Sequence, residues 1–442
     1  MEKRWILHTP DPEAIERLRL DLKLNPVLLQ LLVNRGITDL ETARKFFRPQ
    51  EALLHSPWLM KDMDKAVDRL QQALNQGEKI LIYGDYDVDG TTSVASFYAF
   101  LRKHHSAVDF YIPHRYREGY GLSRAGIDHA IQQGYQLIVT LDCGIKSIEL
   151  IADAKAHGID VIICDHHLPD HILPPAIAIL NAKQSDCPYP FKELCGCGVG
   201  YKLMCALCER MDWPISEADE NIDLLATAIA ADIVSMSGEN RILTYRGLKK
   251  ANEHPNIGIR ALANLSGLKK QLQIQNLVFM IAPRVNAAGR MDDACKAVEL
   301  FTAADEEIAR EYAEALHADN DERRQADRSI TREALQQIES NPQWEERVST
   351  LVYQPDWHKG VVGIVASRLI ETYHRPTIVL TRSGDEATGS ARSIPGFNLY
   401  EAIYACRDLL TRYGGHMAAA GMSLPHDQVD AFRERFEQAV SN

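Results

Sequence analysis

Short apolar runs alternate with amphipathic segments through the first half of the chain. Three runs rich in Ile, Leu and Val are typical of buried strands: 79–83, 136–141 and 160–164. Three segments between them have apolar residues at helical spacing: 93–103, 125–133 and 147–157. This alternation predicts βαβ units, and therefore a parallel sheet whose strands end at one common edge.

The rest of the chain predicts three further parts around this α/β domain. The predicted domains are a helical N-terminal extension (1–50), the α/β domain (51–255), a mainly helical connector (256–342) and a smaller α/β domain (343–442). Asn341-Pro342 is expected to close the long helix of the connector. Strands near 348–353 and 377–381 and a helix near 361–372 are expected in the last domain. The predicted fold class is α/β, with a parallel-sheet domain joined by a long helical connector to a smaller α/β domain.

Acidic residues follow the apolar runs. Asp85, Asp87 and Asp89 come at alternate positions directly after the first run, and carboxylates so crowded repel one another unless a cation joins them. The second run ends in Asp142 and the third in Asp165-His166-His167. Because parallel strands end at one edge, these side chains are expected to be neighbours. Divalent ions such as Mg²⁺ and Mn²⁺ prefer oxygen ligands, so the pattern predicts a metal site.

One more acid lies in an almost wholly apolar segment, 224–234, which has helical character. Burying an isolated charge is costly, so Asp232 is expected either to cap this helix or to coordinate a metal. The other acidic motifs favour coordination.

Two other kinds of metal site fit the sequence less well. The motif from Asp85 to Gly90 matches the start of an EF-hand loop, but loop position twelve is Ser96 instead of Glu and a strand precedes it. A zinc site could use Cys195, Cys197 and the later pair Cys205 and Cys208, but that pair lies in a helix-like segment without a knuckle glycine. Buried free thiols are the better interpretation, and nine cysteines favour a reducing compartment over a disulfide framework.

Composition describes an ordinary soluble protein of two or three domains, with 442 residues, 45% hydrophobic and 25% charged. No membrane span or signal peptide is evident, so a cytoplasmic location is expected. The net charge of −12 argues against broad nucleic-acid binding, although the distribution of charge matters more than its sum. No G-x-S-x-G, P-loop or dinucleotide motif offers a competing chemistry.

In their order, these motifs resemble the signature of the DHH phosphoesterase superfamily, and the chain resembles its RecJ branch nearly end to end. The matching motifs are Gly84–Gly90, Asp142–Gly144, Asp165–His167, Ala231–Val234, Arg117–Ser123, Pro283–Arg290, His358–Arg368 and Gly414–His416. The last of these is similar to the Gly-Gly-His of the DHHA1 substrate domain. The α/β domain 51–255 is thus expected to be a DHH catalytic domain, and the last domain, 343–442, a DHHA1 domain.

The resemblance implies two divalent metal ions, Mn²⁺ or Mg²⁺, with the mixed histidine and carboxylate ligands favouring Mn²⁺. The implied ligands are Asp87, Asp89, Asp142, His166 and Asp232. Asp85 and Asp165 are expected to accept hydrogen bonds that orient the ligands. His167 is expected to contact the scissile phosphate, so that His167, Asp142 and Asp85 are the expected catalytic residues. Tyr83 stands where some relatives carry a histidine.

Substrate binding is expected in later motifs that offer guanidinium groups, hydroxyls and open glycine backbone to phosphate. The residues are Arg284, Asn286, Arg290, His358, Ser390, Arg392, Ser393, Gly414, Gly415 and His416. Arg115 could add a phosphate contact and Tyr120 a surface on which bases stack. The alternative for any one of these arginines is an ordinary surface salt bridge.

The resemblance predicts a 5′-to-3′ exonuclease that degrades single-stranded DNA to mononucleotides in DNA repair and recombination. Single-stranded DNA is the implied partner, with a helicase and a single-strand-binding protein by family role; a monomer without membrane association is expected. RecJ-like chains commonly continue into an oligonucleotide-binding domain, whereas this sequence ends soon after His416. If such a domain normally binds DNA, this chain is expected to bind single-stranded DNA more weakly.

Three alternatives remain at this point. Smaller superfamily members cleave short oligoribonucleotides, cyclic dinucleotides or 3′-phosphoadenosine phosphate, but usually lack the N-terminal lead-in and the helical middle. A family pyrophosphatase would carry a different C-terminal domain. An inactive replication scaffold would lose metal ligands, whereas all five are kept here.

Overall fold

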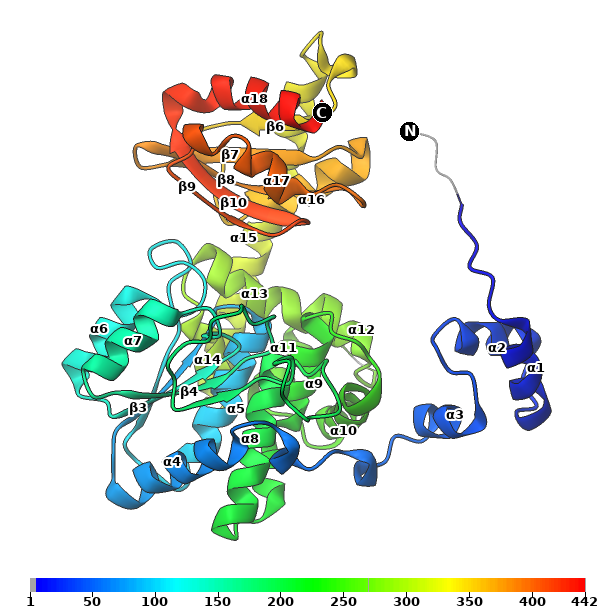
Figure 1. Ribbon diagram of the computed structural model, residues 1–442, viewed down its shortest axis with the longest axis vertical. Coiled ribbons are helices and arrows are strands. Elements are labelled where there is room, and N and C mark those ends of the chain that lie inside the picture. The colour runs from blue at the N-terminus through cyan, green and yellow to red at the C-terminus, as the bar shows by residue number, and fades with distance from the viewer. Residues whose placement is uncertain (1–4, 269, 442) are drawn as a thin grey trace. The chain divides into compact units, whose positions relative to one another are not determined.

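The long helix α15 (Glu306–Glu339) links two structural units. The computed structural model describes residues 5–268 and 270–441. The first unit ends at His317 and the second begins at Ala318, both within α15 (Figure 1). None of the helices in these described ranges is long and apolar enough to cross a membrane.

The first unit contains a parallel five-stranded sheet. Its strands are β1 (Ile80–Gly84), β2 (Val108–Tyr111), β3 (Leu137–Leu141), β4 (Asp160–Cys164) and β5 (Ala178–Leu180). The order is β2-β1-β3-β4-β5, with all pairs parallel. The chain therefore runs outward from β1 to β2 and then crosses to β3, which places the change of direction between β1 and β3. The carboxyl ends of strands at such a point are where ligands bind in this class of sheet.

Helices cover both faces of this sheet (Figure 1). Those on one face are α4 (Met63–Gln76), α5 (Val88–Arg102) and α8 (Gly196–Met211), and those on the other are α6 (Arg124–Gln133) and α7 (Ile148–Ala156). Ile80 and Ile82 belong to the first core, whereas Leu81 and Tyr83 belong to the second. Because both faces are buried, the strands appear in sequence as continuous apolar runs, and the predicted parallel sheet is confirmed.

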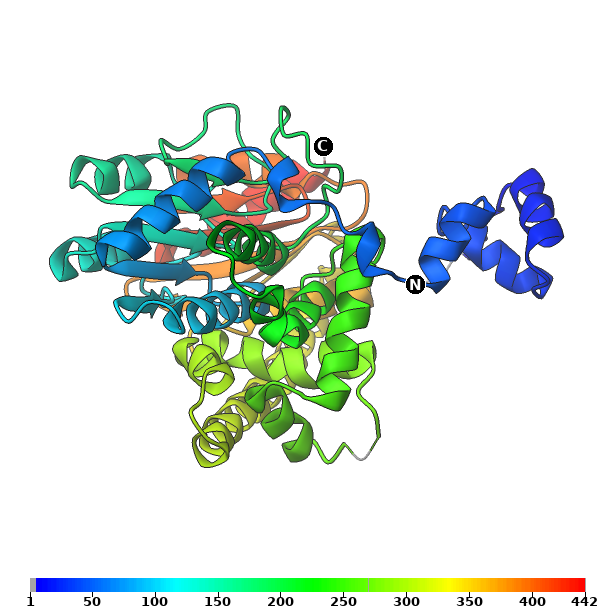
Figure 2. The same cartoon turned by 90° about the horizontal axis from the view of Figure 1, so that it is seen from below.

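Further helices complete the first unit. The N-terminal three pack around a small core of their own (Figure 2) and are α1 (Pro12–Asp21), α2 (Pro26–Val33) and α3 (Leu40–Phe47). The later ones are α9 (Ile222–Ala231), α10 (Gly238–Glu253), α11 (Ile257–Leu265), α12 (Ile274–Asn276), α13 (Ala282–Met291) and α14 (Cys295–Phe301). A single π-helical turn, Leu277–Ile281, precedes α13. Helix α9 packs between α5 and α10, which brings the end of α9 towards the sheet edge.

The second unit contains a mixed sheet of the order β6-β7-β8-β10-β9. Its strands are β6 (Thr350–Tyr353), β7 (Thr377–Ser383), β8 (Glu386–Arg392), β9 (Arg412–Gly415) and β10 (Ala419–Pro425). Helix α16 (Val362–Tyr373) packs on β7 and β8, and α17 (Leu399–Tyr404) and α18 (Val429–Ser441) complete the core. The sequence predicted β6, β7 and α16. It missed β8 and β10 because their Gly, Ala and Ser residues carry little of the β-branched pattern.

Helix α5 begins at Val88, five residues before the predicted start near Ser93. The Asp87 carboxylate accepts a hydrogen bond of 3.0 Å from the Gly90 amide and caps the helix. A Cβ atom at Gly90 would lie 2.3 Å from the Asp85 carbonyl oxygen, so glycine permits this close turn. The acidic motif therefore divides between strand end and helix, with Asp89 in the first helical turn.

Candidate metal centre

Asp142 just after β3, Asp232 at the end of α9 and Asp89 of α5 gather around one ring nitrogen of His166, which follows β4. His166 Nε2 lies 3.1 Å from Asp142 Oδ1, 3.6 Å from Asp232 Oδ2 and 3.8 Å from Asp89 Oδ2. Two sets of three residues each offer ligand atoms within 4.8 Å of one another: Asp89, His166 and Asp232, and Asp142, His166 and His167. Four of the five expected ligands are thus side by side.

Several of these atoms are buried without a hydrogen bond. Among the described residues, Asp142 Oδ1, Asp85 Oδ2 and both ring nitrogens of His166 have no hydrogen-bond partner. A buried polar atom left unsatisfied is costly, so the cluster is incomplete as a purely protein structure. Carboxylate oxygens and an imidazole nitrogen are a donor set that Mn²⁺ and Mg²⁺ accept. The residues present therefore fit a divalent cation.

The protonation of the cluster agrees with this fit. Burial, and then the charges of Asp89 and Asp87, raise the pKa of Asp142 well above its usual value and raise the pKa of Asp232 to about 8. Burial lowers the pKa of His166, which keeps the imidazole neutral. Metal ligands must be ionised carboxylates and neutral imidazoles. A cation would therefore displace protons from the acids, whereas the histidine would already be in its neutral, ligating form.

The amino terminus of α8 holds Asp89 in place. Asp89 accepts hydrogen bonds from the Gly196 amide at 2.6 Å and the Cys197 amide at 2.8 Å. A Cβ atom at Gly196 would lie 2.5 Å from the Asp142 Cβ, so only glycine lets α8 approach both acids. Sequence analysis missed this role because it considered residues 195–197 only for their cysteines. The signal was the three glycines at alternate positions, Gly196, Gly198 and Gly200, at the start of a helix-like segment.

Asp165 and Asp85 accept hydrogen bonds from the surrounding backbone, as residues that orient ligands do. Asp165 Oδ1 accepts from the His166 amide (2.7 Å), the His167 amide (3.1 Å) and His167 Nδ1 (2.7 Å), and Oδ2 accepts from the Ile145 amide (3.0 Å). Burial opposes ionisation of Asp165, but the hydrogen bonds and the charge of His167 outweigh it and lower the pKa to about 2. Asp85 accepts from the Gly121 amide at 3.1 Å.

Asp87 lies beside the cluster in a different role. It caps α5, and it is absent from both three-residue sets found in the described part of the chain. Its charge nevertheless raises the pKa of Asp85, Asp142 and Asp232, so it belongs to the same electrostatic centre. Its assignment as a ligand stays a prediction.

The loop after β2 brings Tyr120 to His167. The Tyr120 hydroxyl lies 3.2 Å from His167 Nε2, and its side chain is half exposed. Glu118 holds the loop, accepting hydrogen bonds from the His114 amide (2.8 Å) and the Ser123 hydroxyl (2.6 Å). The Tyr83 side chain packs in the core on the α6 and α7 side of the sheet, and its hydroxyl accepts a hydrogen bond from the Ser123 amide at 3.1 Å.

Arg115 lies in the same loop, with its guanidinium carbon 4.8 Å from the centre of the Tyr86 ring. The remaining expected contacts of the first unit lie on α13, where Arg284, Asn286 and Arg290 are all half-buried. Arg284 donates to the Met280 carbonyl at 2.5 Å and lies 3.3 Å from His317 Nδ1.

The second unit brings most of its expected substrate residues to one end of its sheet. Gly421 of β10 pairs with Ser390 on one side and with Gly414 on the other, and Ala420 pairs with Ala391 and Gly415. Arg392 Nη1 donates to the Ser390 hydroxyl at 2.7 Å.

Turns on either side complete this group. The Ser393 amide donates to the Ala418 carbonyl at 2.9 Å, and the His416 amide donates to the Ala419 carbonyl at the same distance. A Cβ atom at Gly363 would lie 3.0 Å from Arg392 Nη2, so the start of α16 lies against this group. His358 lies in the loop before α16, where burial lowers its pKa.

Eight of the nine cysteines are buried and Cys295 is partly exposed, and all nine are free thiols, in agreement with the predicted buried thiols. The strand before Asp85 is likewise confirmed.

Two family models match the chain. The DHH family N-terminal domain matches residues 79–231 and the DHHA1 domain matches residues 347–442. The single-stranded-DNA-specific exonuclease RecJ of Salmonella typhimurium is 38% identical over 97% of this chain and 77% of its own length. The chain belongs to the RecJ family. The RecJ of Bacillus subtilis is 40% identical over 99% of this chain, and the chain spans about half (55%) of that relative's length.

Solved RecJ structures are similar to the chain. A crystal structure of exonuclease RecJ bound to manganese is 33% identical, with a TM-score of 0.79, and the match covers 89% of this chain and 97% of that one. RecJ from Thermus thermophilus in complex with Mn²⁺ is 30% identical, with a TM-score of 0.84 over 98% of this chain and 62% of that one. The complex with Mg²⁺ from the same organism has 28% identity and a TM-score of 0.77, over 98% of this chain and 60% of that one.

Proposed function

We propose that this RecJ-family chain is a metal-dependent exonuclease that degrades single-stranded DNA to mononucleotides in the 5′-to-3′ direction. The observation that carries the proposal is the gathering of Asp89, Asp142 and Asp232 around His166, with ligand atoms that lack hydrogen-bond partners within the described ranges. The names of the curated relatives support the substrate. Polarity, and a role in DNA repair and recombination in the cytoplasm, come from the family resemblance.

The proposed centre holds two divalent cations, Mn²⁺ or Mg²⁺, through Asp87, Asp89, Asp142, His166 and Asp232. Two such ions in one site neutralise a phosphodiester, lower the pKa of a bound water and stabilise the leaving oxygen. Each of the chain's own groups has a defined task. The α8 amides fix Asp89, and Asp165 fixes the backbone and ring of His167. Asp85 fixes the Gly121 backbone, beside Tyr120.

His167 is proposed to contact the scissile phosphate through Nε2. Its Nδ1 is engaged by Asp165 at 2.7 Å, so Nε2 is the nitrogen that can donate to a substrate oxygen when the ring is protonated. Burial lowers the pKa of His167, but the hydrogen bond and charge of Asp165 outweigh it and the pKa is raised. The raised pKa favours the protonated ring, which suits an anionic phosphate. The Tyr120 hydroxyl, 3.2 Å from His167 Nε2, would then lose this contact, and the Tyr120 ring would pack against a base or sugar of the substrate.

Binding of the strand is proposed for the half-buried α13 residues Arg284, Asn286 and Arg290 and for the group around Arg392. Guanidinium groups, hydroxyls and exposed glycine amides are suited to phosphate. Gly414 has no atom within 4 Å of an added Cβ, which leaves room beside the backbone. A helicase and a single-strand-binding protein are proposed as partners by family role, with the enzyme acting as a monomer.

The decisive experiment is a time course with Mn²⁺ on single-stranded DNA labelled at either the 5′ or the 3′ end, beside duplex and RNA controls. Immediate release of labelled mononucleotide from the 5′-labelled strand alone is expected. Release from the 3′ label would reverse the polarity, and equal cleavage of RNA would widen the substrate. No cleavage of any strand with metal bound would instead favour a short oligoribonucleotide or cyclic dinucleotide substrate, or an inactive scaffold.

A further inference from the structure

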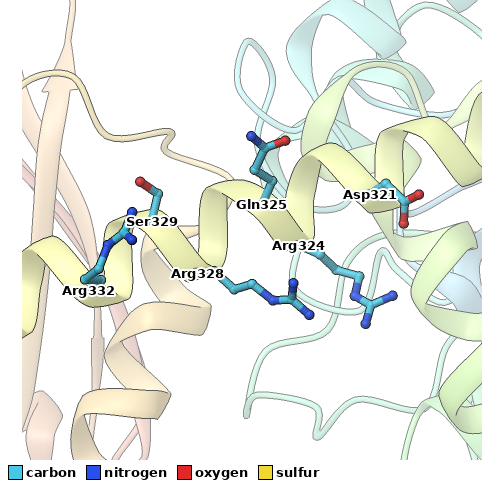
Figure 3. Close-up of a pocket in the computed structure, with 6 residues that line it drawn as sticks. All are labelled: Asp321, Arg324, Gln325, Arg328, Ser329 and Arg332. Atoms are coloured by element: carbon cyan, nitrogen blue, oxygen red, sulfur yellow. The ribbon is translucent and has the colours of Figure 1, made fainter.

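Three arginines form a row along the part of α15 that belongs to the second unit. Arg324, Arg328 and Arg332 are all exposed and follow one another at four-residue intervals. Residues four apart lie on the same face of a helix, at steps of about 6 Å along its axis. A pocket is lined by this row and its neighbours, and Figure 3 shows the six side chains: Asp321, Arg324, Gln325, Arg328, Ser329 and Arg332.

Two acids beside this row on the helix, Asp327 and Glu333, are bound to other side chains. Asp327 is buried and accepts two hydrogen bonds of 2.7 Å from Arg368 on α16. Glu333 accepts from Trp357 Nε1 at 2.8 Å and from the Ser329 hydroxyl at 3.0 Å.

The three arginines differ from the arginines around them. Within the described ranges, no ion pair joins Arg324, Arg328 or Arg332 to an acid, whereas the neighbouring Arg323 and Arg368 both face Asp327. Asp321 is the one acid among the six lining residues named for this pocket. The row is therefore a local excess of positive charge on a chain whose net charge is −12.

We propose that this row binds phosphates of a single-stranded nucleic acid other than the phosphate being cleaved. The inference rests on the proposed function and extends it by assigning part of the strand to α15. Positive charges at a regular spacing along the helix match the regularly spaced phosphates of an extended single strand. Guanidinium groups bind phosphate oxygens through two parallel hydrogen bonds. Contacts of this kind carry no sequence information, as a general exonuclease requires. They also provide a local group of positive charges on a chain whose net charge is −12.

The test compares the wild-type chain with the triple variant Arg324→Gln, Arg328→Gln and Arg332→Gln. Binding to a fluorescent 30-nucleotide oligo-dT is measured by anisotropy in EDTA, across a series of salt concentrations, so that no cleavage occurs. At low salt the triple variant is expected to bind about tenfold more weakly. The slope of log affinity against log salt is expected to fall by about 2, since each phosphate contact on a single strand contributes about 0.7.

Two matched variants separate the proposed role from general effects of charge. The triple variant Arg382→Gln, Arg433→Gln and Arg435→Gln removes the same charge from the same unit and is expected to leave the salt slope unchanged. The triple Arg→Lys variant of the row keeps the charge and is expected to retain most of the affinity. Equal losses in the row and the control variant, or an unchanged salt slope in the row variant, would overturn the proposal.

Cleavage kinetics on a series of strand lengths complete the test. The Gln variant of the row is expected to raise KM on long strands, to leave kcat unchanged and to have no effect on a dinucleotide. A defect that is the same at all lengths would place these arginines in folding or in the reaction itself and overturn the proposal. If the wild-type chain cleaves no strand, the proposed function fails, but the binding measurement in EDTA still decides whether the row holds a strand.

Discussion

The candidate metal centre of the first unit and the proposed phosphate-binding surfaces of the second unit use charge in opposite ways. Around His166, ionisable acids are buried and close together, and burial raises the pKa of Asp142, Asp85 and Asp232. In the second unit, Arg324, Arg328 and Arg332 are exposed, and Arg392 is half-buried. The first arrangement disfavours its own ionised state until a cation is added, whereas the second keeps three of its four guanidinium groups exposed to solvent.

This difference predicts that substitutions in the two places will change different kinetic quantities. A change in the metal centre should alter the chemical step, and removal of an acid should not destabilise the metal-free fold. A change in the second unit should alter the binding of substrate while the chemical step remains. The two kinds can therefore be told apart by measuring kcat, KM and thermal stability together.

The largest effect is expected for Asp142→Asn. Asp142 has a φ of 62°, a backbone conformation that asparagine adopts more readily than alanine, so Asn removes the charge with little strain. Loss of a metal-binding carboxylate is expected to lower kcat by about 10³-fold or more.

The same variant should not lower the melting temperature of the metal-free protein, because it removes one of several acids that burial keeps from ionising. Calorimetry in EDTA and single-turnover kinetics with Mn²⁺ measure the two quantities. Substantial remaining turnover would show that the cluster is not catalytic, and a large fall in melting temperature would make Asp142 structural.

The second largest effect is expected for Gly196→Ala. The added Cβ would lie 2.5 Å from the Asp142 Cβ, so either Asp142 or the α8 amides that bind Asp89 must move. Turnover and Mn²⁺ affinity are each expected to fall by about 10²-fold, the size seen when groups that orient metal ligands are lost.

Gly198→Ala, in the same helical turn as Gly196, is the matched control. Its Cβ would lie 3.3 Å from the Leu194 side chain and would not contact the acids. The two variants gain the same helix propensity. Equal activity of both would mean that the close approach at Gly196 does not position the ligands.

Much of this centre could be predicted from the sequence because its acids follow apolar runs, and parallel strands bring such ends together. Asp142 and His166 were predicted as neighbours on that ground, and Asp142 Oδ1 lies 3.1 Å from His166 Nε2. Asp232 was expected to join them because it is an acid in an apolar helix, and its Oδ2 lies 3.6 Å from the same nitrogen. The contribution of Gly196 could not be predicted, since it depends on a backbone approach between segments far apart in sequence. The early start of α5 was missed because Asp87 was considered only as a ligand, although aspartate is also a strong helix cap.

The second unit was harder to predict for a physical reason. Strands β8 and β10 are held by backbone pairing between Gly, Ala and Ser residues, such as Ser390 with Gly421, and these residues give no clear alternation. The row on α15 was interpreted as part of a solvated helix face. Only the structure shows that Asp327 and Glu333 are bound within the unit while the arginines stay exposed.

A third prediction concerns pH. The pKa of Asp232 is raised from 3.8 to about 8, so the folded metal-free protein holds a proton that the unfolded chain releases. The stability that this proton contributes is complete below about pH 4 and is lost as pH rises to about 8. Melting temperatures in EDTA should therefore fall between about pH 5 and pH 8, and saturating Mn²⁺ should remove the fall.

Metal affinity should rise in the same range, by about tenfold per pH unit for each proton displaced. Calorimetric titration with Mn²⁺ in buffers of different ionisation enthalpy measures the protons released. Asp232→Asn is the control and should release fewer protons at neutral pH. Binding without proton release would contradict the raised pKa values of the centre.

The smallest effect is expected for Arg392→Ala, which tests the other side of the comparison. Arg392 donates to the Ser390 hydroxyl at 2.7 Å and lies against the start of α16, far in sequence from every metal ligand. A lost phosphate contact should raise KM by about fivefold to tenfold while kcat and Mn²⁺ affinity stay the same. Arg382→Ala, at the opposite end of the same strand pairing, is the control and should change neither. If Arg392→Ala lowered kcat and left KM unchanged, a second-unit residue would act on the chemical step, and the division of labour between the two units would be wrong.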